Sequence, residues 1–130
     1  FDTIYAAYIL GFCYQNGYGC EKNMKKACSF FDNAGYYKEQ FNFEYDTTKQ
    51  PVFVKDNKTD LEIKLYKSII IIQNGTTYEY KKYHIESIEI TNTLLKKQAV
   101  ITTYLDKRYV FKDKNIVELL KNFKELNGIK

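Results

Sequence analysis

The spacing of hydrophobic residues changes twice along the chain. Over residues 2–16 apolar side chains recur at helical spacing, and Asn16-Gly17 ends the pattern with a residue suited to a helix C-terminus. Asn23 is placed to cap a second helix with apolar positions on one side. Because a short glycine-bearing loop joins them, the two helices are predicted to form an antiparallel hairpin over residues 1–37.

The glycines, alanines and aromatic residues of this hairpin form a motif. It consists of Leu10, Gly11, Tyr14, Gly17, Gly19, Ala27, Phe30 and Ala34. The motif resembles the SEL-type repeat, a relative of the tetratricopeptide repeats, over residues 4–36. The resemblance implies an α-solenoid unit that acts as a scaffold for protein partners. Because such repeats need neighbours to bury their apolar stripe, the hairpin is expected to dock on the rest of the chain or to end an array within a longer SEL-repeat protein.

From about residue 38 apolar and polar residues alternate, which is typical of β-strands. Residues 38–50 are predicted to be a linker or a first strand, because Phe41, Phe43 and Tyr45 alternate with polar neighbours. Further strands are predicted at residues 52–54, 61–65, 68–73, 77–80, 85–90, 99–104 and 108–111. The strand at residues 68–73 is expected to be buried on both faces. Asn74-Gly75 is the strongest hairpin signal in the chain.

Helical spacing returns after these strands. Asn115 and Glu118 have the spacing of a capping box, an apolar stripe follows, and Gly128 ends the helix. Short strands followed by one amphipathic helix resemble the pleckstrin-homology (PH) superfold, including its GRAM members, over residues 60–128. That resemblance implies an antiparallel sandwich or barrel, capped by the C-terminal helix, in a domain at residues 51–130. The whole chain is therefore predicted to be α+β.

The charge of the chain is uneven and consists mostly of lysine. The formal net charge is +4, and because residues 1–40 hold four acids and four lysines, the excess lies in residues 41–130. Arg108 is the only arginine, so the bidentate contacts typical of nucleic-acid recognition are not expected. The candidate contacts to an anionic ligand are Lys64, Lys67, Lys81 and Lys82. The pair Lys96-Lys97 could also meet an anionic headgroup.

No pattern of catalytic or metal-binding residues is found. His84 is the only histidine and is expected to be structural or on the surface, so neither catalytic residues nor a cofactor are predicted. Cys13, Cys20 and Cys28 are interpreted as small buried apolar residues rather than metal ligands. Their odd number favours a reducing compartment, and a cytoplasmic location is expected. The longest aliphatic run, Ile69 to Ile72, is far too short to cross a membrane.

These observations favour a non-enzymatic protein-interaction or adaptor module built on the helical hairpin. The alternative is peripheral binding to anionic lipid through the PH-like domain. The identity of a protein partner is not indicated by the residues.

Overall fold

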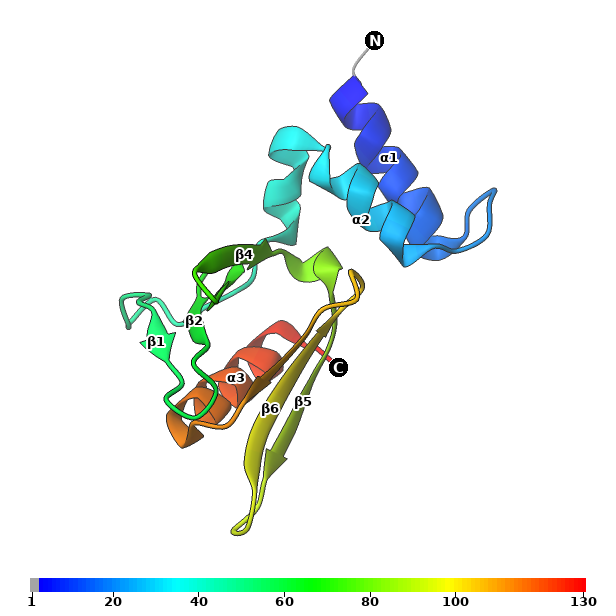
Figure 1. The fold of residues 1–130 in the computed structure, drawn as a ribbon. Helices are drawn as coiled ribbons and strands as arrows, with labels where there is room; N and C mark the ends of the chain where they lie inside the picture. Colours follow the sequence, from blue (N-terminus) through cyan, green and yellow to red (C-terminus); the bar gives the residue numbers. More distant parts are fainter. Residues whose placement is uncertain (1–2) are drawn as a thin grey trace. The chain divides into compact units, whose positions relative to one another are not determined.

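The computed structural model describes residues 3–130 and divides into two compact units. Unit 1 ends at Asn42, and unit 2 comprises Phe43–Lys130. Figure 1 shows helices near both ends of the chain and antiparallel strands between them, which confirms the predicted α+β class. Each unit is described by itself.

Unit 1 consists of helices. Helix α1 spans Thr3–Asn16, helix α2 spans Met24–Asp32, and a 3-10 helix, η1, spans Gly35–Phe41. The predicted cap of α2 is confirmed, because the Asn23 side chain accepts a hydrogen bond from the Lys26 backbone N–H at 3.0 Å. The loop before Asn23 turns at Gly17 and Gly19, whose φ angles of 72° and 71° are unfavourable for other residues.

The two helices of unit 1 approach closely at Gly11. A Cβ atom there would lie 2.5 Å from the Phe31 ring, so the backbone of α1 packs directly against that ring. Ala27 and Ala34 are fully buried nearby. Tyr14 and Phe30 stack with their ring centroids 5.5 Å apart. Small residues thus set the distance between the helices, and aromatic rings fill the space around them.

The strand predicted around Phe41 is wrong. Phe41 ends η1, and no strand begins before Val54 in the described residues. The three alternating aromatic residues contact different groups: Phe41 packs on Phe31, Phe43 on Phe123 and Tyr45 on Tyr66. Their alternation therefore does not reflect one sheet face, and the linker alternative describes this segment better.

Unit 2 contains two antiparallel sheets and a C-terminal helix. The four-stranded sheet comprises β1 (Val54–Lys55), β2 (Glu62–Leu65), β3 (Ile69–Gln73) and β4 (Thr76–Tyr80), in that order. After the short 3-10 helix η2 (Lys82–His84), the three-stranded sheet comprises β5 (Ile85–Asn92), β6 (Lys97–Thr103) and β7 (Arg108–Phe111). Over the described residues the two sheets do not join, so the predicted sandwich does not close into a barrel.

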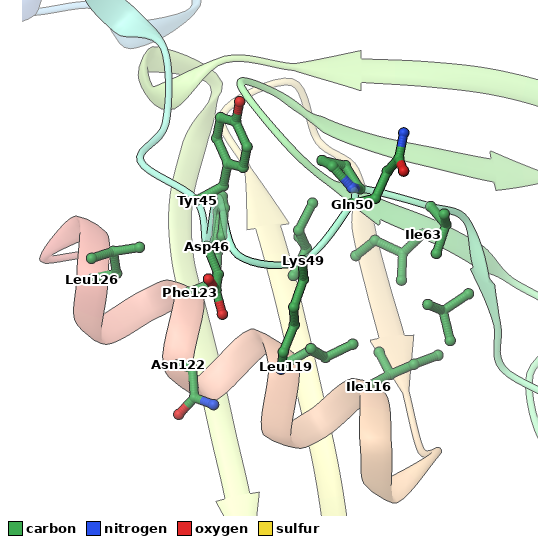
Figure 2. A pocket seen from close by; sticks show the side chains of 14 residues that line it. Tyr45, Asp46, Lys49, Gln50, Ile63, Ile116, Leu119, Asn122, Phe123 and Leu126 are labelled. Carbon is green, nitrogen blue, oxygen red and sulfur yellow. The ribbon is translucent and has the colours of Figure 1, made fainter.

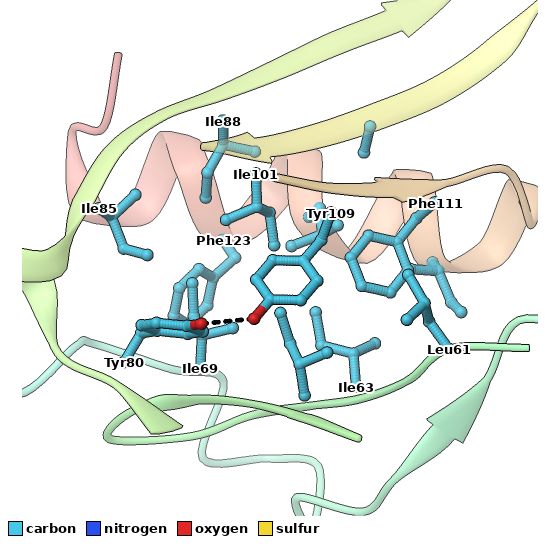
Figure 3. Packing of buried hydrophobic residues seen from close by; sticks show 14 of the residues in the cluster. Leu61, Ile63, Ile69, Tyr80, Ile85, Ile88, Ile101, Tyr109, Phe111 and Phe123 are labelled. Carbon is cyan, nitrogen blue, oxygen red and sulfur yellow. Dashed lines mark hydrogen bonds between the residues drawn. The ribbon is translucent and has the colours of Figure 1, made fainter. Parts of the chain in front are cut away.

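The core of unit 2 lies between the sheets and helix α3 (Lys114–Asn127), as Figure 3 shows. The hydroxyl groups of Tyr80 and Tyr109 form a hydrogen bond inside this core, and burial raises the pKa of both.

In β3, Ile69 and Ile71 are fully buried, whereas Ile70 and Ile72 are half-buried. The prediction that this strand is buried on both faces is therefore wrong, because one face packs on the core and the other is only partly covered.

Helix α3 begins earlier than its sequence pattern predicted. Its N-cap is Asp113, not Asn115, and the Asp113 carboxylate accepts hydrogen bonds from the backbone N–H groups of Asn115 and Ile116 at 2.9 and 3.2 Å. Aspartate is as good a cap as asparagine, so the capping-box spacing alone did not identify the start. Gly128 ends the helix with a φ of 61°, as predicted.

Candidate functional site

The turn between β5 and β6, Thr93–Lys96, is the hairpin tip. Thr93 donates its backbone N–H to the Lys96 carbonyl at 2.9 Å, and the Thr93 hydroxyl accepts the Lys96 N–H at 3.0 Å. The central residues, Leu94 and Leu95, are 102% and 100% exposed. In Figure 1 the β5–β6 hairpin extends beyond the other elements of unit 2, with this turn at its far end. The two leucines are therefore held in water at the end of a projecting hairpin.

Five exposed lysines from three parts of unit 2 lie on one side of the tip. They border a shallow hollow of about 670 Å³ together with the two leucines. The lysine cluster consists of Lys58, Lys96, Lys97, Lys112 and Lys114. The acid in this lining, Asp113, already caps α3. The surface around the leucines is thus strongly positive.

A buried carboxylate holds the backbone at Lys58 and Lys112, two of the five lysines, in place. Asp56 is fully buried and accepts backbone N–H bonds from Lys112 at 2.6 Å and Asp113 at 3.0 Å. Its other oxygen accepts the Lys58 N–H at 2.9 Å. Burial alone would raise the pKa of Asp56, but these N–H donors outweigh it and keep the pKa below its ordinary value. Asp56 therefore links the backbone that carries Lys58 to the start of α3.

The structure does not bring the predicted anion-binding lysines to this tip. The ammonium groups of Lys64 and Lys67 lie over the Tyr66 ring, 5.5 and 5.7 Å from its centroid. Lys67 lies in the β2–β3 turn. Strand pairing places this turn next to the C-terminal end of β4, which Lys81 and Lys82 follow directly. Strand β5 separates these two from the tip by roughly 25 Å, at about 3.3 Å per residue.

The sequence indicated Lys96 and Lys97 as candidate lipid contacts, but not the two leucines or the other three lysines of the cluster. Lys58 is distant in sequence from Lys112 and Lys114, and Asp56 joins the backbone of the two segments. Leu94-Leu95 had a local signal that was overlooked: two consecutive leucines stand where the residues around them predict a turn.

The residues of the predicted repeat occupy different environments. Gly11, Ala27 and Ala34 are buried, while Tyr14 and Phe30 stack. Gly17 and Gly19 form the loop between the helices, and Leu10 is 42% exposed. Most of the motif thus lies at the contact between α1 and α2 or in their loop, and Leu10 lies on an exposed side of α1.

The single histidine and the cysteines have structural environments. His84 is buried, and its Nδ1 accepts the Lys81 backbone N–H at 2.9 Å. Burial, with a contribution from Asp32, raises the pKa of the Cys28 thiol to about 11. Cys13 and Cys20 are only half-buried, so the expectation of buried thiols holds for Cys28 alone. Among residues 3–130 no group of histidine, cysteine and acidic side chains is arranged to hold a metal ion.

The chain was compared with protein families, curated proteins and solved structures. No family model, curated protein or solved structure matches it. The resemblances to SEL-type repeats and to PH domains therefore rest on the sequence patterns alone. In the part of the chain that the structure describes, none of the helices is long and apolar enough to span a bilayer.

Proposed function

We propose that this protein binds the surface of anionic membranes peripherally, through the hairpin tip of unit 2. The observation that carries the proposal is the full exposure of Leu94 and Leu95 inside a cluster of five exposed lysines. The leucines enter the boundary between headgroups and acyl chains, while the lysines contact anionic headgroups. The expected site of action is a cytoplasmic membrane face, where anionic lipids give a negative surface potential.

The leucines and the lysines contribute comparable energies. Burying a leucine side chain is worth about 1.5–3 kcal/mol, and a lysine close to an anionic bilayer is worth about 1 kcal/mol. One apolar anchor gives only marginal, reversible membrane binding, so stable association needs a second signal. The tip combines both signals at one place.

Co-sedimentation with vesicles tests this proposal. The full chain is expected to bind vesicles of phosphatidylcholine and phosphatidylserine and not vesicles of phosphatidylcholine alone. Lys96→Glu/Lys97→Glu and Leu94→Ser/Leu95→Ser should each abolish most of that binding. Because salt screens lysine contacts, raising the ionic strength should weaken binding of the unaltered protein.

Two matched controls separate the tip from general charge and apolar exposure. Lys81→Glu/Lys82→Glu makes the same charge change at the other end of β5, and Leu105→Ser removes an exposed leucine from the β6–β7 turn. Both should bind like the unaltered protein. If the Lys81/Lys82 variant lost binding and the tip variants kept it, the proposed site would be wrong.

Unit 1 supports a second candidate function, the protein-interaction or adaptor role favoured by the sequence. Apolar residues occur all around α1, and α2 and η1 pack against part of its surface. Tyr5, Ile9 and Leu10 remain 49%, 40% and 42% exposed. A helix that is apolar on all sides is normally buried, so a helical surface of a partner protein is the expected cover.

Photo-crosslinking tests this second role. A crosslinking residue at Leu10 is expected to capture one defined protein in native lysate, whereas the same residue at Glu21, in the loop after α1, should not. Ile9→Ser should reduce the yield at Leu10. Equal, diffuse labelling from both positions would contradict a specific surface on α1.

A further inference from the structure

A second site of unit 2 is independent of the tip. The irregular segment Tyr45–Phe53, here called the strap, forms one wall of a pocket of about 350 Å³ that β2 and α3 complete (Figure 2). The apolar walls and floor include Val54, Ile63, Leu65, Ile116, Leu119 and Phe123. Ile63, Ile116 and Phe123 belong to the buried core. The pocket therefore leads from the surface to the core.

The strap is fixed at both ends. At its start, the Asn127 side chain donates to the Glu44 carbonyl at 2.9 Å and accepts the Glu44 N–H at 2.7 Å. At its end, Val54 pairs with Ile63 in the sheet. Because α3 packs mainly on β5 and β6, the strap spans a gap between this helix and the four-stranded sheet. The pocket is thus a built feature held by specific contacts.

The walls of the pocket suit an apolar group better than water. A water molecule needs two to four polar partners, and these side chains offer none. A volume of about 350 Å³ lies at the lower end of the range for small-molecule sites, which are mostly apolar with a few polar groups at defined places. The occupant should therefore have a small apolar body.

The polar residues of the pocket lie at its rim. Lys49, Gln50 and Asn122 offer N–H donors there. The only acid in the lining is Asp46, which accepts hydrogen bonds from the Thr48 side chain and backbone. These bonds, with a smaller contribution from the charge of Lys49, lower the pKa of Asp46. Lys49 is the one cation of the lining and is the group at the rim that an anionic head would contact.

We propose that this pocket binds a free fatty acid. The acyl chain lies between the strap, β2 and α3, and the carboxylate lies at the rim beside Lys49. A carboxylate matches the one cation of the lining, Lys49, and an acyl chain matches the apolar walls. This assignment does not depend on membrane binding by the tip.

Titration of the full-length protein with dodecanoate, followed by nitrogen-15 NMR, tests the proposal. Saturable changes in the amide chemical shifts should be confined to the strap, β2 and the exposed turns of α3. This first measurement uses the unaltered protein alone. Dodecanol should bind several-fold more weakly, and dodecyltrimethylammonium more weakly still. Equal binding of all three amphiphiles, or shifts spread over both units, would overturn the proposal.

Variants sharpen the assignment. Leu119→Trp fills the pocket and should weaken dodecanoate binding by at least about tenfold, as expected when a buried apolar ligand is excluded. Leu105→Trp, a matched change on the β6–β7 turn, should have no effect.

Lys49→Glu should weaken the binding of dodecanoate several-fold and leave that of dodecanol unchanged, whereas Lys55→Glu should change neither. Leu94→Ser/Leu95→Ser should keep dodecanoate binding, so failure of the tip and failure of the pocket are distinguishable. If Lys49→Glu affected dodecanol and dodecanoate alike, the carboxylate assignment would be wrong.

Discussion

The β3–β4 turn and the β5–β6 turn of unit 2 each have two central residues, between Gln73 and Thr76 in the first and between the hydrogen-bonded Thr93 and Lys96 in the second. The first uses Asn74 and Gly75, with φ angles of 51° and 77°, the left-handed values that a tight hairpin requires. The second uses Leu94 and Leu95, neither of which has a positive φ, and the Thr93 side chain closes the turn instead. Backbone geometry explains the first pair of residues.

Backbone geometry does not explain the leucines. Many polar residues would fit the same turn, and both leucine side chains are left fully in water. Nothing in unit 2 gains from their apolar surface, whereas a membrane would. Under the proposed function, one turn serves folding and the other serves a membrane surface.

Exchanging the turn residues should have the largest effect. Leu94→Asn/Leu95→Gly gives the tip the chemistry of the β3–β4 turn. Since two leucines together contribute about 3 kcal/mol or more, binding to phosphatidylserine vesicles should fall about a hundredfold. Co-sedimentation measures the loss, and the Tm should not fall, because Asn-Gly is a favourable hairpin turn. Unchanged binding would mean that the leucines do not contact lipid.

The surroundings of the two turns differ as well, because Asp56 joins the loop that carries Lys58 to Lys112 and Asp113 near the tip. In the unaltered protein the Asp56 carboxylate accepts hydrogen bonds from the backbone N–H groups of Lys112 and Asp113. Asp56→Asn replaces this charged acceptor with a neutral amide, so the free energy of unfolding should fall by about 3 kcal/mol near neutral pH. Urea denaturation measures this difference. Asp113→Asn, which keeps a good helix cap, is the control and should lose less than about 1 kcal/mol.

The difference in stability between the unaltered protein and Asp56→Asn should also depend on pH. Since the folded-state pKa of Asp56 is lowered, its stabilisation is present above its unfolded pKa of about 3.9 and is lost as the pH falls through the lower folded value. The difference in unfolding free energy between the unaltered protein and Asp56→Asn should therefore shrink in acid. A difference that stays constant below about pH 3 would contradict the assigned role of the carboxylate.

The reverse exchange tests the folding turn. Asn74→Leu/Gly75→Leu places leucine at two positive φ angles that asparagine and glycine tolerate better, and the free energy of unfolding should fall by about 2 kcal/mol. Thermal denaturation measures the loss. Vesicle binding should not increase, since the lysine cluster lies at the other hairpin. Increased binding would show that any exposed leucine pair is sufficient.

The two turns also show what the sequence could predict. Asn74-Gly75 was identified at once because turn chemistry is local, as were the Asn23 cap and the glycine loop of unit 1. Aromatic alternation around Phe43 was misleading, because partners distant in sequence, such as Phe123, determine where each ring packs. The lysine cluster was not predictable for the same reason: the loop that carries Lys58 is joined to Lys112 and Asp113 by one buried carboxylate, Asp56.

Single-lysine variants should give the smallest effects and separate the two kinds of contact. Lys114→Ala should weaken vesicle binding about fivefold, which corresponds to about 1 kcal/mol for one lysine near an anionic surface. Lys55→Ala, at an exposed lysine outside the cluster, should change binding little. The salt dependence of binding should also become shallower in Lys114→Ala, because one fewer charge is screened.

In Leu94→Ser/Leu95→Ser the residual binding should keep its full salt dependence, since all five lysines remain. If both variants changed the salt dependence equally, the leucines and lysines would not be acting as separate contacts, and the contrast between the two turns would need another explanation.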